Sequence, residues 1–147
     1  MEVSNLIKKM FELPYQFAVP DILYEEELKE DHENLLDYGL IMKMVSEESI
    51  LYLENSLSQY SKIGFYDKLA LAVAKQESCP LVTGDGALRI AGKDEAIVVL
   101  GTVWLMDELI IHSLISMEEA REAYALMKDN GRRLPWKMIE DKLSDSL

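Results

Sequence analysis

Apolar residues recur along the chain in two patterns, which together divide it into helices and strands. Apolar positions three and four residues apart predict an amphipathic helix over 3–13, which Pro14 ends. Similar spacing, with many alanines, predicts a buried helix over 65–76 after the break at Gly64. Short apolar runs predict four strands, at 15–19, 40–45, 80–83 and 96–100.

Turn and capping residues set the ends of the other predicted helices. Pro20, followed by many acidic residues, predicts the start of a helix that continues to about residue 38 and ends at Gly39. Ser46 begins a helix that continues to about residue 60, and Asp85 precedes a short one. Three more helices are predicted at about 103–112, 116–130 and 135–143.

This order of elements predicts an α/β fold. Strands that alternate with helices are typical of a parallel sheet of about four strands with helices on both faces. The last helices are expected to form a helical C-terminal extension. A chain of 147 residues is long enough for a single domain with a core of its own.

Composition limits the classes of protein that fit. The formal net charge of −12 argues against indiscriminate nucleic-acid binding, which needs Lys and Arg to neutralise phosphates, but it does not exclude a nuclease. No apolar run reaches the length of a membrane span, and Glu2 is unlike the start of a signal peptide, so a cytoplasmic protein is expected. The single cysteine, Cys79, excludes an internal disulfide and is expected in the core.

Two aspartates stand out against this background. Asp85 follows an apolar strand, and in α/β sheets ligands bind at the carboxyl ends of strands. Asp67 lies in the first turn of the helix that precedes that strand. Each also has a structural explanation, because Asp67 would stabilise the helix dipole and Asp85 would cap a helix.

Together these carboxylates point to a metal site. The helix of Asp67 leads directly into the strand of Asp85, so the two side chains can meet at one sheet edge, and a glutamate from the run Glu25–Glu27 can join them. Taken singly, the glutamates fit a solvated helix face better. Carboxylate oxygens are the ligands that Mg²⁺ and Mn²⁺ prefer, and crowded like charges need such a cation.

Other candidate groups carry weaker signals. His32 and His112 have no partner at ligand spacing, and the Thr83 hydroxyl could orient a water but fits a strand residue better. Trp136 could stack on a base, although packing is the better interpretation. Basic residues that could line a substrate groove, or be scattered surface charge, are Lys8, Lys9, Lys62, Lys68, Arg89, Arg132 and Arg133.

Three segments together resemble the PIN domain, a family of metal-dependent nucleases that includes many toxins of toxin–antitoxin pairs. They are a strand-to-helix segment with glutamates at 19–28, a helix headed by Asp67 at 65–74, and a strand-end aspartate motif at 81–85. The likeness covers residues 3–114 and implies a PIN-like domain at 1–114 with a C-terminal helical extension at 115–147. It also implies a three-layer fold.

The resemblance implies a Mg²⁺- or Mn²⁺-dependent endoribonuclease that hydrolyses RNA phosphodiesters. Asp67, Asp85 and Glu26 would be catalytic, and the same residues with Glu27 would bind the metal. Counting from Pro20 favours Glu26 as the glutamate, whereas counting back from the end of the segment favours Glu27. The implied partners are an RNA substrate, an antitoxin protein and a second copy in a homodimer, with no membrane.

One departure from the family pattern keeps an alternative open. PIN domains usually begin with a strand that ends in an aspartate and occupies the centre of the sheet, and no such strand precedes the helix at 3–13. The sequence is then either short at that end or a degenerate member, a non-catalytic interaction module. A small-molecule enzyme on a flavodoxin-like sheet fits less well, because no phosphate-binding loop is present.

Overall fold

The computed structural model describes residues 3–30 and 34–145. The chain divides into two compact units. Gln16–Gly101 contains all the strands among the described residues and is called the sheet unit here. Met1–Tyr15 and Thr102–Leu147 together form the other, called the helical unit.

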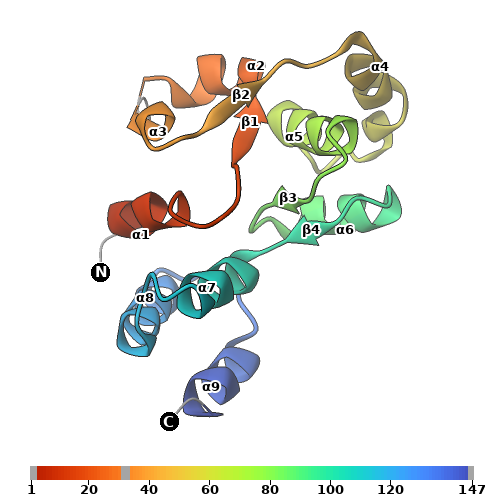
Figure 1. Cartoon of the computed structure of the whole chain (residues 1–147). Helices are drawn as coiled ribbons and strands as arrows, with labels where there is room; N and C mark the ends of the chain where they lie inside the picture. The colour runs from red at the N-terminus through yellow and green to blue at the C-terminus, as the bar shows by residue number, and fades with distance from the viewer. Residues whose placement is uncertain (1–2, 31–33, 146–147) are drawn as a thin grey trace. The chain divides into compact units, whose positions relative to one another are not determined.

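The sheet unit alternates short strands with helices, as Figure 1 shows. Its elements are β1 (Ala18–Pro20), α2 (Asp21–Leu23), the π-helical turn η1 (Tyr24–Leu28), α3 (Asn34–Asp37), β2 (Ile41–Lys43), α4 (Glu47–Asn55), the 3-10 turn η2 (Leu57–Gln59), α5 (Phe65–Gln76), β3 (Leu81–Val82), α6 (Gly86–Asp94) and β4 (Val99–Leu100). The predicted α/β class with parallel strands is therefore confirmed.

The strands form two separate parallel pairs, which corrects the prediction of one four-stranded sheet. β1 pairs with β2, with Ala18 opposite Ile41, and β3 pairs with β4, with Leu81 opposite Val99. The strands are only two or three residues long, and in the described residues no ladder joins β1 to β3. The helix α5 contacts both of these strands, so it connects the two pairs within the unit.

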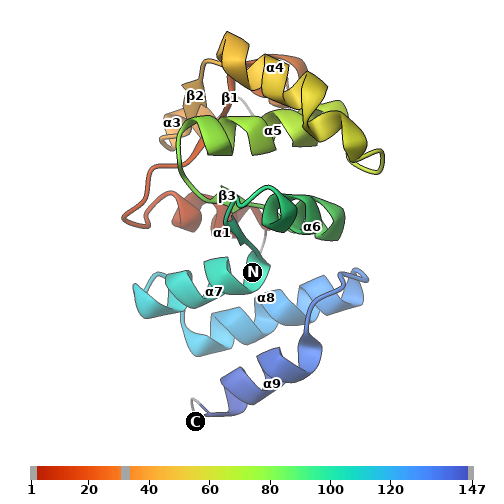
Figure 2. The same cartoon turned by 90° about the vertical axis from the view of Figure 1, so that its right-hand side faces the viewer.

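The core of the sheet unit gathers around α5, whose bounds agree with the sequence prediction. Leu69 and Leu71 of this helix are fully buried. α5 lies beside α4 in Figures 1 and 2 and also contacts α6. Other buried members of the core are Leu53, Leu57, Ile63, Ala72, Ala74, Leu88, Ala91 and Ile97. This packing holds the first turn of α5 and the β3–α6 turn in fixed positions.

Two further predictions about the sheet unit were wrong. The helix predicted from Pro20 to residue 38 is instead α2 with η1, followed by a separate α3, because the chain widens into a π turn in which the Lys29 N–H donates to the Tyr24 carbonyl at 2.9 Å. Gly39 does end the helical region, at φ +115°. Cys79 is exposed rather than buried, since it lies in the turn that leaves α5.

The helical unit consists of α1 (Val3–Met10), α7 (Thr102–Ile111), α8 (Met117–Asp129) and α9 (Trp136–Asp145). α7 contacts both α1 and α8, and Figure 2 shows α7 and α8 side by side. Trp136 packs edge-on against Tyr124, with 6.3 Å between ring centroids, which confirms the packing interpretation. None of the described helices has the length and apolar character that a membrane crossing requires.

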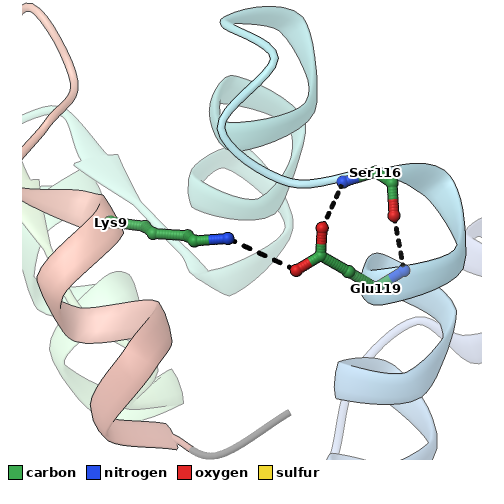
Figure 3. Close-up of polar contacts among 3 residues, drawn as sticks. All are labelled: Lys9, Ser116 and Glu119. Carbon is green, nitrogen blue, oxygen red and sulfur yellow. Dashed lines mark hydrogen bonds and ion pairs between the residues drawn. The ribbon is translucent and has the colours of Figure 1, made fainter.

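A capping box begins α8 and ties it to α1, as Figure 3 shows. The Ser116 hydroxyl accepts from the Glu119 N–H at 3.0 Å, and the Glu119 carboxylate accepts from the Ser116 N–H at 3.1 Å. Lys9 of α1 approaches the other Glu119 oxygen at 3.3 Å. The Ser116 N–H and the Lys9 ammonium hold the pKa of Glu119 below its usual range.

Candidate active site

Asp67 lies in the first turn of α5, three residues after the N-cap Gly64. The side chain is half-buried at a helix end where backbone N–H groups concentrate positive potential. Burial raises the pKa of its carboxyl group, and the nearby Asp85 carboxylate raises it further. No side-chain hydrogen bond to this carboxylate is formed by the described residues, so it lies beside a like charge without a donor.

Asp85 is the N-cap of α6, as its structural interpretation from the sequence predicted. Its Oδ1 accepts from the Ala87 N–H at 2.8 Å and from the Leu88 N–H at 3.3 Å. The Thr83 hydroxyl accepts from the Asp85 N–H at 3.2 Å, which fixes the turn between β3 and α6. Both caps use the same carboxylate oxygen, so capping and the binding of a cation through Oδ2 are compatible.

The two aspartates lie within range of an electrostatic interaction. Asp85 raises the pKa of Asp67 through their mutual repulsion, an effect that requires proximity. Asp67 lies in the first turn of α5 and Asp85 follows β3 at the N-cap of α6, so the interaction joins segments 18 positions apart in the chain. This interaction excludes an arrangement with the two carboxylates on opposite sides of the unit.

Glu26 is connected to the same region through a residue that the sequence reasoning missed. The Tyr66 phenol, adjacent to Asp67 in α5, donates a hydrogen bond to the Glu26 carboxylate. This bond, with burial and the charges of Glu26 and Glu27, raises the pKa of Tyr66 to about 12. Glu25 instead pairs with Lys29 at 3.1 Å. The position of Tyr66 beside Asp67 was the only signal that could have identified it.

The candidate metal ligands are only partly grouped in the structure. Among the described residues, no three His, Cys, Asp or Glu side chains form a group that could hold a metal ion. Mg²⁺ is commonly bound through one or two carboxylates, with waters and substrate phosphates as its other ligands. The Asp67–Asp85 pair fits that mode. Metal ligation by this pair, and by Glu26 and Glu27, stays a prediction.

The structure describes one of the two histidines, and it lies outside the sheet unit. His112 belongs to the helical unit, where its Nε2 lies 3.2 Å from a Glu108 oxygen and its ring meets Tyr15 edge-on. His32 lies outside the described residues.

Comparison with known families identifies the class of protein. A protein-family model described as a PIN domain matches residues 2–146, which is nearly the whole chain and includes both units. The chain therefore belongs to the PIN domain family. Proteins of this family are generally nucleases that use divalent metals. No curated protein and no solved structure matches the chain.

Proposed function

We propose that this PIN-domain protein is a Mg²⁺- or Mn²⁺-dependent endoribonuclease that hydrolyses RNA phosphodiesters. The electrostatic interaction between the Asp67 carboxylate, in the first turn of α5, and the Asp85 carboxylate, at the N-cap of α6, is the observation that carries the proposal. An ionised pair of this kind, which is partly desolvated and has no hydrogen-bond donor to Asp67 among the described residues, is repulsive by itself. A divalent cation between the two would remove that repulsion, which gives the pair a chemical reason to exist.

Separate residues would hold the cation and keep its ligands in position. Asp67 and Asp85 would hold the cation, and Glu26, or Glu27 beside it, would supply a further carboxylate. Tyr66 would orient Glu26 through its hydrogen bond, and Thr83 would keep the Asp85 turn in place. When bound, a divalent cation activates water for attack and offsets the charge of the transferring phosphate.

The two strand pairs support a further part of this proposal. β1 and β3 both contact α5, and among the described strands each is hydrogen-bonded to one neighbour, β2 for β1 and β4 for β3. A central strand between them would join the pairs into one five-stranded sheet, and its terminal aspartate would add a ligand beside Asp67 and Asp85. We take residues 1–114 as the PIN-like domain in this arrangement and residues 115–147 as its helical extension.

The biological setting is proposed from the family alone. The enzyme would act as a toxin of a toxin–antitoxin pair, with the antitoxin as its protein partner, and would form a homodimer. Gel filtration of the chain, alone and with the product of a neighbouring small gene, tests these partners directly.

Cleavage of single-stranded RNA tests the proposed activity. We expect Mg²⁺ or Mn²⁺ to be required, and the variants Asp67→Asn and Asp85→Asn to lose more than about 100-fold in rate, because outer-shell residues alone typically contribute about 10–100-fold. Asp37→Asn, which neutralises an exposed carboxylate on α3, should cleave normally. Normal cleavage by both Asn variants would refute the assignment. The assay should include a chain extended by an N-terminal strand ending in aspartate.

A non-catalytic interaction module is the second candidate function. The observation that favours it is the lack of a third converging ligand among the described residues. Such a module would bind RNA or protein without cleaving, with or without metal. Metal-dependent cleavage by the extended chain would exclude it.

A further inference from the structure

Arg89 lies at the same end of the β3–β4 pair as Asp85. Its backbone N–H donates to the Asp85 carbonyl at 3.1 Å, so it is one helical turn further along α6. Its guanidinium lies against the backbone of Gly101, where a Cβ would overlap Nη2 and approach Cζ to 3.3 Å. That same Cβ position is 3.7 Å from the Thr83 carbonyl oxygen.

These neighbours place the guanidinium at the carboxyl edge of two strands. Thr83 directly follows β3, and Gly101 directly follows β4. The Thr83 N–H donates to the Leu100 carbonyl at 2.9 Å, so the two strand ends lie side by side. Ligands of open α/β sheets bind at this edge. Arg89 and Asp85 therefore both stand where a substrate would approach.

The Arg89 guanidinium forms no ion pair and donates no hydrogen bond within the described residues. Among the described basic residues of the sheet unit that form no ion pair, Arg89 is the one whose side chain packs against the backbone at a strand end. Lys29 and Lys43 of the same unit, by contrast, pair with Glu25 and Glu77.

We propose that Arg89 binds a phosphate of the RNA backbone next to the phosphate that is cleaved. The guanidinium fork suits bidentate hydrogen bonds to phosphate oxygens, and its packing against Gly101 limits the conformations it must lose on binding. This contact positions the substrate and carries no sequence information. The inference rests on the proposed nuclease function, since it assigns one contact in that same site.

Binding of a phosphorothioate-stabilised single-stranded RNA, measured by fluorescence anisotropy with Mg²⁺ present, tests the proposal. Arg89→Gln should weaken binding several-fold, and the slope of log affinity against log salt should fall by about 0.7, the value for one phosphate contact on a single strand. Arg89→Lys should restore part of the affinity. Lys93→Gln removes an exposed cation from the last turn of the same helix and should change neither quantity.

A second variant separates the position of the charge from its presence. Gly101→Ala keeps the arginine but places a methyl group where the guanidinium now lies, and only the flexible end of that side chain must move. We expect its RNA affinity to fall in the same way as that of Arg89→Gln. Thermal unfolding of each variant verifies that the fold is retained.

The outcomes distinguish this inference from the proposed function. Unchanged affinity and salt slope in Arg89→Gln, or an equal loss in Lys93→Gln, would overturn the Arg89 contact and leave the nuclease proposal standing. Wild-type protein that binds RNA through Arg89 but cleaves none would overturn the nuclease proposal and, of the inference, leave only the contact between Arg89 and an RNA phosphate. Wild-type protein that binds no RNA would overturn both.

Discussion

The carboxyl groups of Glu95 and Asp67 have pKa values shifted in opposite directions by their surroundings. Glu95 accepts from the Tyr52 hydroxyl at 2.5 Å and the Tyr60 hydroxyl at 2.8 Å, and these bonds lower its pKa. Asp67 has a raised pKa and no such donors among the described residues. Glu95 therefore stabilises the fold when ionised, whereas the ionised Asp67 does not, which is typical of a functional group.

The pH dependence of stability follows from the lowered pKa of Glu95. Its contribution is fully present above the unfolded value of about 4.3 and is lost as the pH falls through the lower folded value. Glu95→Gln should reduce the free energy of unfolding by about 0.5–1 kcal/mol at pH 7, after allowance for solvent screening. Urea denaturation at several pH values should show a smaller acid loss in the variant than in the wild type. Equal acid loss in both would contradict this account.

Local sequence patterns predict which residues lie at the ends of helices and strands. They do not predict which side chains touch across segments that are distant in the chain. Asp67 and Asp85 could be predicted because each follows a clear element boundary. Tyr66 and the orientation of Arg89 could not, because a hydrogen bond to Glu26 and packing against Gly101 depend on segments distant in the chain.

Among the elements, α6 shows how closely packing restricts a single position. Gly92 faces β4, and a Cβ there would overlap the Val99 side chain and lie 3.3 Å from the Ile97 carbonyl oxygen. The glycine is buried, so the helix can approach the strand this closely only without a side chain. α6 carries both Asp85 and Arg89 at its start, and this contact thus helps to fix the candidate site.

Substitution of Gly92 by alanine tests that close approach. Overpacking should lower the free energy of unfolding by about 1–3 kcal/mol, more than alanine's better helix propensity returns. Gly86→Ala in the first turn of the same helix is the matched control, since a Cβ there meets nothing within 4 Å. The midpoint of urea denaturation should fall for the first variant and not for the second. A Gly92→Ala protein as stable as wild type would show that the contact is loose.

Element boundaries could be predicted where strong local signals exist. Gly64 begins α5 and Ser46 caps α4, both as expected. The helix boundaries after Pro20 could not be predicted. Apolar spacing does not distinguish a continuous helix from one that widens into a π turn at Tyr24. The four-stranded sheet also failed as a prediction, since strand pairing is set by long-range contacts rather than by the strands' own sequences.

At the scale of the whole molecule, the family match spans both compact units while the candidate site lies in the sheet unit. The site depends on α5 and α6, which are packed into one core and bring Asp67 and Asp85 together. The central claim is that this pair binds a divalent cation. It is independent of which RNA is cut and of which partners the protein has.

Titration of the full chain with Mn²⁺ by calorimetry measures that claim directly. We expect a single saturable Mn²⁺ site, and we expect its Mn²⁺ affinity to fall more than about tenfold in Asp67→Asn and in Asp85→Asn. Asp37→Asn should bind as tightly as the wild type. Equal Mn²⁺ affinity in the wild type and both site variants would contradict the account.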